Sequence, residues 1–268
     1  YSWGVNTAPT GLPGTAYGGV GPTQQQVDAY AMNNGRYPII GYEASGDPII
    51  DNASGYSKEE ELQKSDWEYP AKGWSNFKNY NITAPNMYKD REPRFYNTVF
   101  FNGRQWPVSC NQVLFYNGGN SGVQEGQATL TGYMLFKRFN RSVSLTNPGV
   151  ASQFRPSIIF RLADFYLMYA EAANEVNPND ARVLKYLNLV RERAGLPDIE
   201  TLNPAIRGNQ ELQRAAIQRE RQIELATEGQ RYFDVRRWMI ADKNGEGRQN
   251  GYVHGTVSYT HLTLPTIA

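Results

Sequence analysis

The sequence predicts a mainly α-helical fold, in which a tetratricopeptide-like scaffold of paired helices carries a loop-rich portion with short strands. Two observations support this prediction. Apolar residues recur with helical spacing between residues 155 and 243, and the three glycines of that segment fall where helices could end. Residues 1–154 hold 18 of the 25 glycines and 10 of the 15 prolines, a composition typical of loops. We therefore divide the chain into 1–154, 155–243 and a tail at 244–268.

The composition argues against several classes of protein. The 27 basic and 26 acidic residues leave a net charge of +1, so no overall field attracts nucleic acid, and we expect no nucleic-acid partner. One cysteine rules out an internal disulfide, and the two histidines lack ligand spacing, so we expect no metal centre and no cofactor. No apolar run approaches the ~20 residues of a membrane-spanning helix.

Short elements are expected within residues 1–154. The run NTVFFNG at 97–103 is strand-like. The run SGDPIIDNASG at 45–55 is typical of a turn. Asp47 and Asp51 in that run offer hard oxygen ligands for calcium as an alternative, although the regular ligand spacing of a calcium loop is missing.

The first helix of the scaffold is predicted within RPSIIFRLADFYLMYAEAANEV (155–176). Pro156 suits its first turn, and the residues NPND (177–180) stop it and cap the next helix. One side of the helix is expected to be buried because its apolar residues follow the i, i+3, i+4, i+7 rule. The residues of that side are Ile158, Leu162, Phe165, Tyr166, Tyr169, Ala172, Ala173 and Val176.

A second helix is predicted to run antiparallel to the first and to end at Gly195, with Pro197 just beyond. Its apolar side consists of Val183, Leu184, Leu187, Val190 and Ala194.

A further helix pair is predicted, from Asn209 to Glu228 and from Gln230 to about Lys243, separated by Gly229. Helix pairs joined by short turns are the building unit of tetratricopeptide-like solenoids, which is the basis for the predicted scaffold.

The stretch RERQIELATEGQRYFDVRRW (219–238) is dense in charge and allows three interpretations. Its acids alternate with arginines and can neutralise them, which argues against a nucleic-acid surface. Glu224 and Glu228 could act as the acid and base of a glycosidase, but neighbouring arginines would keep both ionised, whereas the general acid needs a raised pKa. We favour a structural role, in which arginine forks lock helix pairs together. The rings expected to pack between these helices are Tyr232, Phe233 and Trp238.

Six segments occur in an order typical of one known family. They are GPTQQQVDAYAMNNG (21–35), YKDREPRFYNTVFFNG (88–103), TGYMLFKRF (131–139), RPSIIFRLADFYLMYAEAANE (155–175), YLNLVRERAGLP (186–197) and RERQIELATEGQRYFDVRRW (219–238). On these segments the chain resembles the C-terminal half of the SusD/RagB family of outer-membrane lipoproteins in Bacteroidota. The order of several separate motifs makes this resemblance specific.

The resemblance implies a surface-exposed protein of the outer membrane that binds glycans or other nutrients and is not an enzyme. Family members sit as a lid on a SusC-like TonB-dependent transporter, and loops on a tetratricopeptide-like scaffold present the ligand site. Because their first half carries a signal peptide and a lipidated cysteine that this chain lacks, we expect membrane attachment only through such a lipid anchor. The family also continues into a longer closing segment, so we expect the last dozen residues of this chain not to be native.

A neutral sugar is held by flat rings against its C–H faces and by amides or carboxylates on its hydroxyls. Both kinds of group occur in segment 1–19, which is too rich in Gly and Pro for a regular element, and in segment 64–81. The candidate ligand-binding residues are Trp3, Asn6, Tyr17, Asp66, Trp67, Trp74 and Asn76. Three stacked rings contribute about 3–4.5 kcal/mol together, which corresponds to millimolar binding. We expect an oligosaccharide or polysaccharide ligand, and no catalytic or metal-binding residue.

Two alternatives stay open at this point. The chain could be a pure interaction scaffold whose helical groove binds another protein. Less favoured is a glycoside hydrolase that uses Glu224 and Glu228.

Overall fold

The computed structural model describes residues 20–45, 47–56, 62–68, 78–104, 113–115, 119–121, 129, 131–137 and 158–241; for 62–68 and 78–86 it describes the backbone alone. The tail predicted at 244–268 lies outside these residues.

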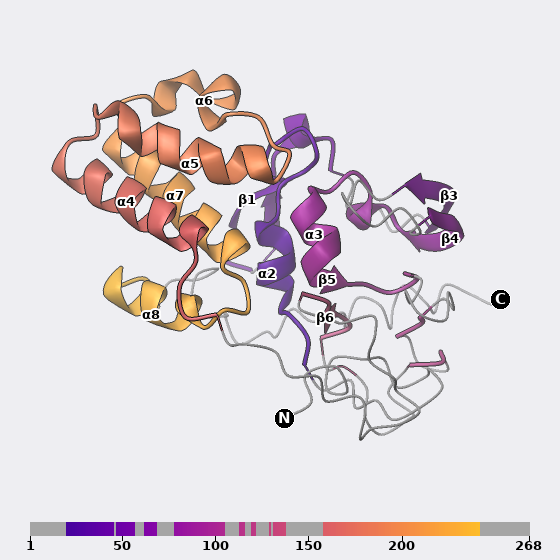
Figure 1. Ribbon diagram of the computed structural model, residues 1–268. Coiled ribbons are helices and arrows are strands. Elements are labelled where there is room, and N and C mark those ends of the chain that lie inside the picture. Colours follow the sequence, from indigo (N-terminus) through magenta and orange to yellow (C-terminus); the bar gives the residue numbers. More distant parts are fainter. Residues whose placement is uncertain are drawn as a thin grey trace.

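The helices after residue 158 form the paired scaffold that the sequence predicts (Figure 1). α4 and α5 run antiparallel, α7 packs against both, and α8 lies beside α4. A short α6 and the 3-10 helix η4 connect α5 to α7. The bounds are α4 Leu162–Val176, α5 Ala181–Arg193, α6 Ile199–Leu202, η4 Pro204–Ile206, α7 Gln210–Glu224 and α8 Gln230–Arg237.

Local caps define several of these helix ends. Asp180 accepts a hydrogen bond from the backbone N–H of Arg182 at the start of α5, and Asn209 does the same for Leu212 at the start of α7. Gly195 adopts a φ of +79° just after α5, a conformation that favours glycine. The ends predicted from these residues are therefore confirmed.

The predicted start of the first helix is wrong. Its predicted buried side is wrong for most of its residues, although Tyr166 and Ala173 of that side do pack against the core. α4 begins at Leu162, not near Pro156. Its buried side is formed by Ala163, Leu167 and Ala170, which pack against α5 and α7. Because α4 carries apolar residues on both sides, periodicity alone could not decide which one faces the scaffold. From the predicted side, Ile158, Leu162, Phe165, Tyr169 and Val176 are exposed.

Two other helices end earlier than predicted. α7 ends at Glu224, not Glu228, and Thr227 has a φ of +67°. The backbone carbonyl groups at the end of α7 have no partner within the helix. Lys137, far away in the sequence, donates to the carbonyl oxygens of Glu224 and Ala226, both at 2.9 Å. α8 ends at Arg237, well before residue 243.

The described strands form three small antiparallel sheets of two strands each. The strand predicted at 97–103 is reduced to Val99–Phe100, because the preceding residues belong to α3. The described elements before residue 158 are α2 Gln24–Ala29, β1 Ile39–Tyr42, β2 Pro48–Ile50, η1 Asn52–Ser54, β3 Leu62–Glu68, β4 Lys78–Pro85, η2 Asn86–Tyr88, α3 Pro93–Thr98, β5 Val99–Phe100 and β6 Met134–Leu135.

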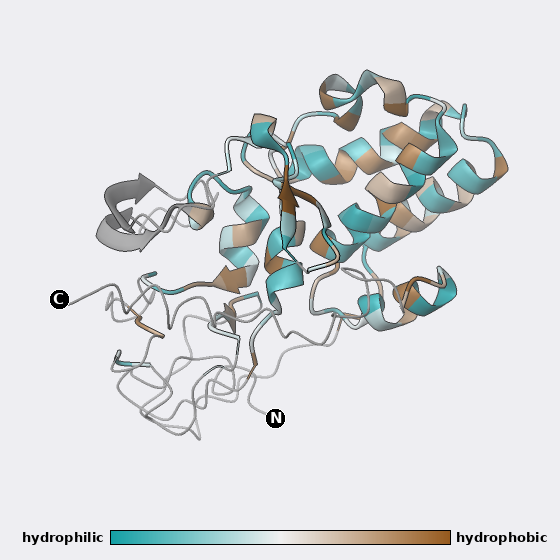
Figure 2. Ribbon diagram, turned by 180° about the vertical axis from the view of Figure 1, so that it is seen from behind, coloured by the Kyte–Doolittle hydropathy of each residue, from teal (hydrophilic) through white to brown (hydrophobic). Residues whose placement is uncertain are grey.

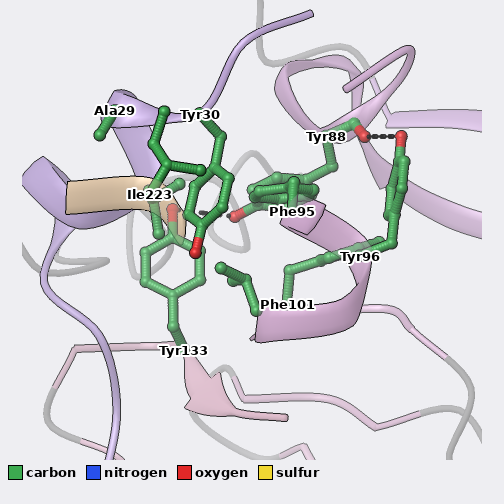
Figure 3. Close-up of a cluster of buried hydrophobic side chains, with 10 residues drawn as sticks. Ala29, Tyr30, Tyr88, Phe95, Tyr96, Phe101, Tyr133 and Ile223 are labelled. Atoms are coloured by element: carbon green, nitrogen blue, oxygen red, sulfur yellow. Dashed lines mark hydrogen bonds between the residues drawn. The ribbon is translucent and has the colours of Figure 1, made fainter. Parts of the chain in front are cut away.

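An aromatic cluster joins this first portion to the scaffold (Figure 3). Tyr88 stacks on Phe101 with ring centroids 4.5 Å apart, and the hydroxyl of Tyr96 donates to the carbonyl oxygen of Tyr88 at 2.6 Å. Ile223 of α7 is buried in the same cluster. The two portions therefore share a core, which places α7 at the centre of the described molecule.

Candidate functional site

The charged stretch of α7 forms a buried network with residues from distant parts of the chain. We call this network the charged seam, and its members are Glu92, Arg94, Lys137, Arg161, Arg193, Glu220, Glu224 and Glu228. Arg94 of α3 is its central cation. It binds Glu92 at 2.6 Å and Glu224 at 3.1 Å, and it also pairs with Glu220.

The second half of the seam closes the C-terminal end of α7. Arg161, just before α4, binds Glu224 at 2.6 Å and Glu228 at 2.7 Å. Lys137 binds Glu228 at 2.7 Å, and Arg193 of α5 pairs with Glu224. The seam therefore ties α3, α5, α7 and the start of α4 together.

A separate ion cluster connects α7 to α4 and α8. Arg221 binds Asp164 at 3.0 Å and Asp234 at 2.9 Å, and all three side chains are buried. Arg237 reaches the same Asp234 at 2.9 Å and also pairs with Glu171 of α4. These contacts support the structural interpretation of the charged stretch, because they connect helices and leave no acid free.

The electrostatics of the seam argue against the glycosidase alternative. Burial by itself would raise the pKa of Glu224, but Arg94, Arg161 and Arg193 outweigh it and hold that pKa below its usual value. The pKa of Glu228 is lowered for the same reason, because hydrogen bonds from Arg161 and Lys137 outweigh burial. Neither carboxyl can therefore hold a proton near neutral pH, as a general acid must.

The rings expected between the last helices behave differently from one another. Tyr232 and Phe233 are exposed on α8, so their predicted packing role is wrong. The guanidinium of Arg236 lies over the Tyr232 ring and covers one of its faces. Trp238 is half-buried and donates its indole N–H to Glu171 at 2.7 Å, which does connect two helices as expected.

Most of the candidate ligand-binding residues lie outside the described residues. These are Trp3, Asn6, Tyr17, Trp74 and Asn76.

Asp66 and Trp67 lie on β3, for which the backbone alone is described. Trp67 is opposite Asn79 of β4, and the register shifts between Ser65 and Trp67. The β3–β4 hairpin stands at the opposite end of the molecule from α4–α6 (Figure 1). The two candidate residues are thus carried by a hairpin, away from the helical scaffold.

The segment considered for calcium is not a single turn, because it contains strand β2 (Pro48–Ile50) and the 3-10 helix η1 (Asn52–Ser54). Asp51 accepts hydrogen bonds from Arg36 at 2.8 Å and from the backbone of Ala53 at 3.0 Å. Asp47 accepts one from Ser45 at 2.9 Å. In the part of the chain that the structure describes, no three or more His, Cys, Asp or Glu residues are arranged to hold a metal ion.

The outward side of α4 and the rings of α8 expose apolar side chains that the sequence analysis expected to be buried. The apolar residues on both sides of α4 were the signal in the sequence that one of these sides could be exposed. Figure 2 shows hydrophobic and hydrophilic residues mixed along the helices. The described helices include none that is long and apolar enough to cross a membrane. We call the exposed set the apolar face, and its members are Ile159, Phe160, Leu162, Phe165, Tyr169, Tyr232, Phe233 and Met239.

Comparison with known proteins gives one consistent result. The family described as the SusD family matches residues 1–263. Two SusD-like proteins of Formosa agariphila are similar: P25 is 46% identical over 83 residues, and P2 is 35% identical over 88 residues. These matches cover 31% and 32% of this chain but only 15% and 17% of those proteins.

A crystal structure of a SusD-like protein from Bacteroides fragilis has the same fold, with a TM-score of 0.59 and 27% identity. The match covers 89% of this chain and 40% of that chain. This chain therefore spans well under half the length of the proteins it matches.

Proposed function

The chain belongs to the SusD family, and from that premise we propose that it binds a glycan at the cell surface and delivers it to a SusC-like TonB-dependent transporter of the outer membrane, without catalysing a reaction. The family match along residues 1–263 is the observation that carries this proposal.

The placement of charge supports a binding role. In the seam each carboxylate is paired with arginine or lysine, so the seam offers no free acid or base to a substrate. Recognition is then left to the aromatic segments of the first portion, of which the β3–β4 hairpin carries Asp66 and Trp67. Stacking on a few rings gives millimolar affinity, which suits a protein that must release its cargo to a transporter.

The apolar face supports a large protein partner. Phe165 and Phe233 keep 54% and 65% of their surface exposed, and clustered exposure of this kind is typical of an interaction site. We assign this face to contact with the transporter. The seam supports the assignment because it holds α4 and α7 in a fixed relation. The ion pair of Arg237 with Glu171 of α4 and that of Asp234 with Arg221 of α7 hold α8 beside them.

The binding function is tested by calorimetric titration of the full-length protein against a panel of plant and host glycans. We expect Trp67→Ala and Trp74→Ala each to weaken the binding of a glycan at least about fivefold, which is ~1 kcal/mol. Tyr232→Ala removes an exposed ring from the scaffold and is the matched control, which should bind normally. If no saccharide binds, the function is wrong; if both tryptophan variants bind normally, the interaction-scaffold alternative is favoured.

The assignment of the apolar face is tested separately by co-purification of the full-length protein with a SusC-like transporter produced in the same cells. Phe165→Glu together with Phe233→Glu should abolish co-purification while glycan binding persists. Val176→Glu changes an exposed residue at the far end of α4 and should leave it intact. Normal co-purification of the double variant would contradict the assignment.

A further inference from the structure

A cleft on the side of α7 away from the apolar face is not explained by any feature described so far. It lies between α2, β1 and α7 and has a volume of about 280 Å³. Its walls include Asp28 of α2, Tyr42 of β1, and Gln218, Arg219 and Gln222 of α7. It shares no lining residue with the charged seam.

The two charged side chains that line the cleft, Asp28 and Arg219, both have hydrogen-bond partners nearby. The carboxylate of Asp28 accepts hydrogen bonds from Gln24 at 2.7 Å and from the hydroxyl of Tyr42 at 2.9 Å. Arg219 donates to the carbonyl oxygens of Ala29 at 3.0 Å and Asp28 at 3.1 Å. The lining holds one acid and one arginine and so carries no net charge, which favours a neutral molecule over an anion or a cation.

The remaining polar groups suit hydroxyls. Gln218 and Gln222 lie one turn of α7 apart, and each side-chain amide has both a donor nitrogen and an acceptor oxygen. Adjacent hydroxyls of a sugar, each of which donates and accepts, match this pair of amides. The ring of Tyr42 adds a flat surface whose position is fixed by its hydrogen bond to Asp28.

The cleft continues into a second and more apolar one of about 390 Å³. The two share Ile40, Ala215 and Arg219 along their common wall. The second cleft adds Leu202, Leu212 and other aliphatic side chains, which can accept the C–H face of a neighbouring sugar unit. Sites for larger ligands usually measure about 300–1,000 Å³, so the first cleft alone suits a ligand of monosaccharide size.

From these observations we propose that the α2–β1–α7 cleft is a subsite for one neutral sugar unit, apart from the aromatic segments of the first portion. The inference rests on the proposed glycan-binding function. A second contact point on the scaffold would strengthen the binding of a polymeric glycan through effective concentration, even though each subsite alone is weak.

The test uses the full-length protein with glutamine side chains labelled with nitrogen-15. Glucose, galactose, mannose and xylose are added separately up to about 50 mM, a concentration that fills sites of millimolar affinity. We expect at least one of them to shift the side-chain amide resonances of Gln218 and Gln222 in a saturable way. Gln218→Leu combined with Gln222→Leu should weaken this sugar at least about tenfold, because two hydrogen bonds are lost.

Two further variants separate a lost contact from a lost fold. Gln230→Leu makes the same change on α8, outside the cleft, and should leave the Gln218 and Gln222 shifts unchanged. Ala215→Phe fills the cleft without removing a polar group and should abolish the shifts. Both variants are checked first by their circular dichroism and thermal unfolding.

The outcomes distinguish this subsite from the function on which it rests. If a panel glycan binds in calorimetry but no sugar moves the two amides, or calorimetry shows that the double leucine variant binds the sugar as tightly as the unmodified protein, the subsite is wrong and the proposed function stands. Nuclear Overhauser contacts from another part of the same polypeptide to Gln218 and Gln222 would also overturn it, because the cleft would already be filled. If no panel glycan binds, both fail together.

Discussion

The charged seam lies deeper in this protein than the apolar face does, although charged groups usually prefer water. Glu220 is fully buried and Glu224 keeps 4% of its surface, whereas Leu162 keeps 63%. Both regions include residues of the scaffold helices. The seam has its partners within the described residues, since Arg94 and Arg161 balance its acids. Against the residues that the structure describes, each residue of the apolar face keeps at least 40% of its surface exposed.

This difference shows that burial follows the supply of partners more closely than hydropathy alone. A buried carboxylate is tolerated when several cations and hydrogen bonds meet it. Clustered apolar side chains that stay exposed are typical of an interaction site, where a partner covers them. Four predictions test whether burial depends on the available partners, and they run from the largest expected effect to the smallest. Each uses the full-length protein.

Removal of a buried cation should have the largest effect. Arg221→Met leaves Asp164 and Asp234 as buried acids with less compensation, so we expect a loss of about 3–5 kcal/mol in the free energy of unfolding. Arg214→Met on the same helix breaks exposed pairs with Glu175 and Glu211 and should cost at most about 1 kcal/mol. Urea unfolding measures both. Equal losses would show that burial does not set the strength of these ion pairs.

The two sides of α4 should differ almost as much. Leu167→Ala removes a fully buried side chain and should cost about 2–5 kcal/mol. Leu162→Ala makes the same change on the exposed side and should alter stability by no more than about 0.5 kcal/mol. The pair is compared by thermal and urea unfolding. A large loss from Leu162→Ala would mean that another part of the polypeptide already covers the apolar face.

The seam should make stability depend on acid pH. The folded-state pKa of Glu224 is lowered, so its stabilisation is complete above the unfolded pKa of about 4.5 and is lost as the pH falls through the folded value. Glu224→Gln should therefore cost about 1.5–3 kcal/mol near neutral pH and progressively less in acid. The difference between the two proteins, followed by urea unfolding from neutral pH downwards, isolates this residue. A difference that does not change with pH would contradict the assignment of a lowered pKa.

The smallest effect on stability is expected on the apolar face. Phe165→Ser should change the free energy of unfolding by no more than about 0.5 kcal/mol, because its ring keeps 54% of its surface in solvent. Light scattering should show less self-association of the isolated protein, since a patch that favours aggregation is reduced. Unchanged self-association would argue against the apolar face as a site of protein–protein contact.

Much of the scaffold could be predicted because its signals are local. The caps at Asp180 and Asn209 and the glycine at 195 act within a few residues, so the sequence states where α5 and α7 begin and where α5 ends. The buried side of α5 was predictable too, because only one of its sides is apolar. The structural role of the charged stretch followed from its alternating signs.

The particular contacts of the seam were not predictable. Arg94 lies 126 residues before Glu220, and Arg161 lies 63 residues before Glu224. Nothing in the pattern of the charged stretch says which distant cation will reach it. The predicted ligand residues remain predictions, because Asp66 and Trp67 are described by their backbone and the others lie outside the described residues.

The sequence by itself determined the helical class, most of the cap positions and the family, since these depend on neighbours a few residues apart and on the order of motifs. Tertiary structure alone decided which side of α4 is buried, where α7 ends and which cation meets each acid. The physical reason is the same in each case. The alternative local structures have similar energies, and the contacts that favour one of them come from residues far away in the sequence.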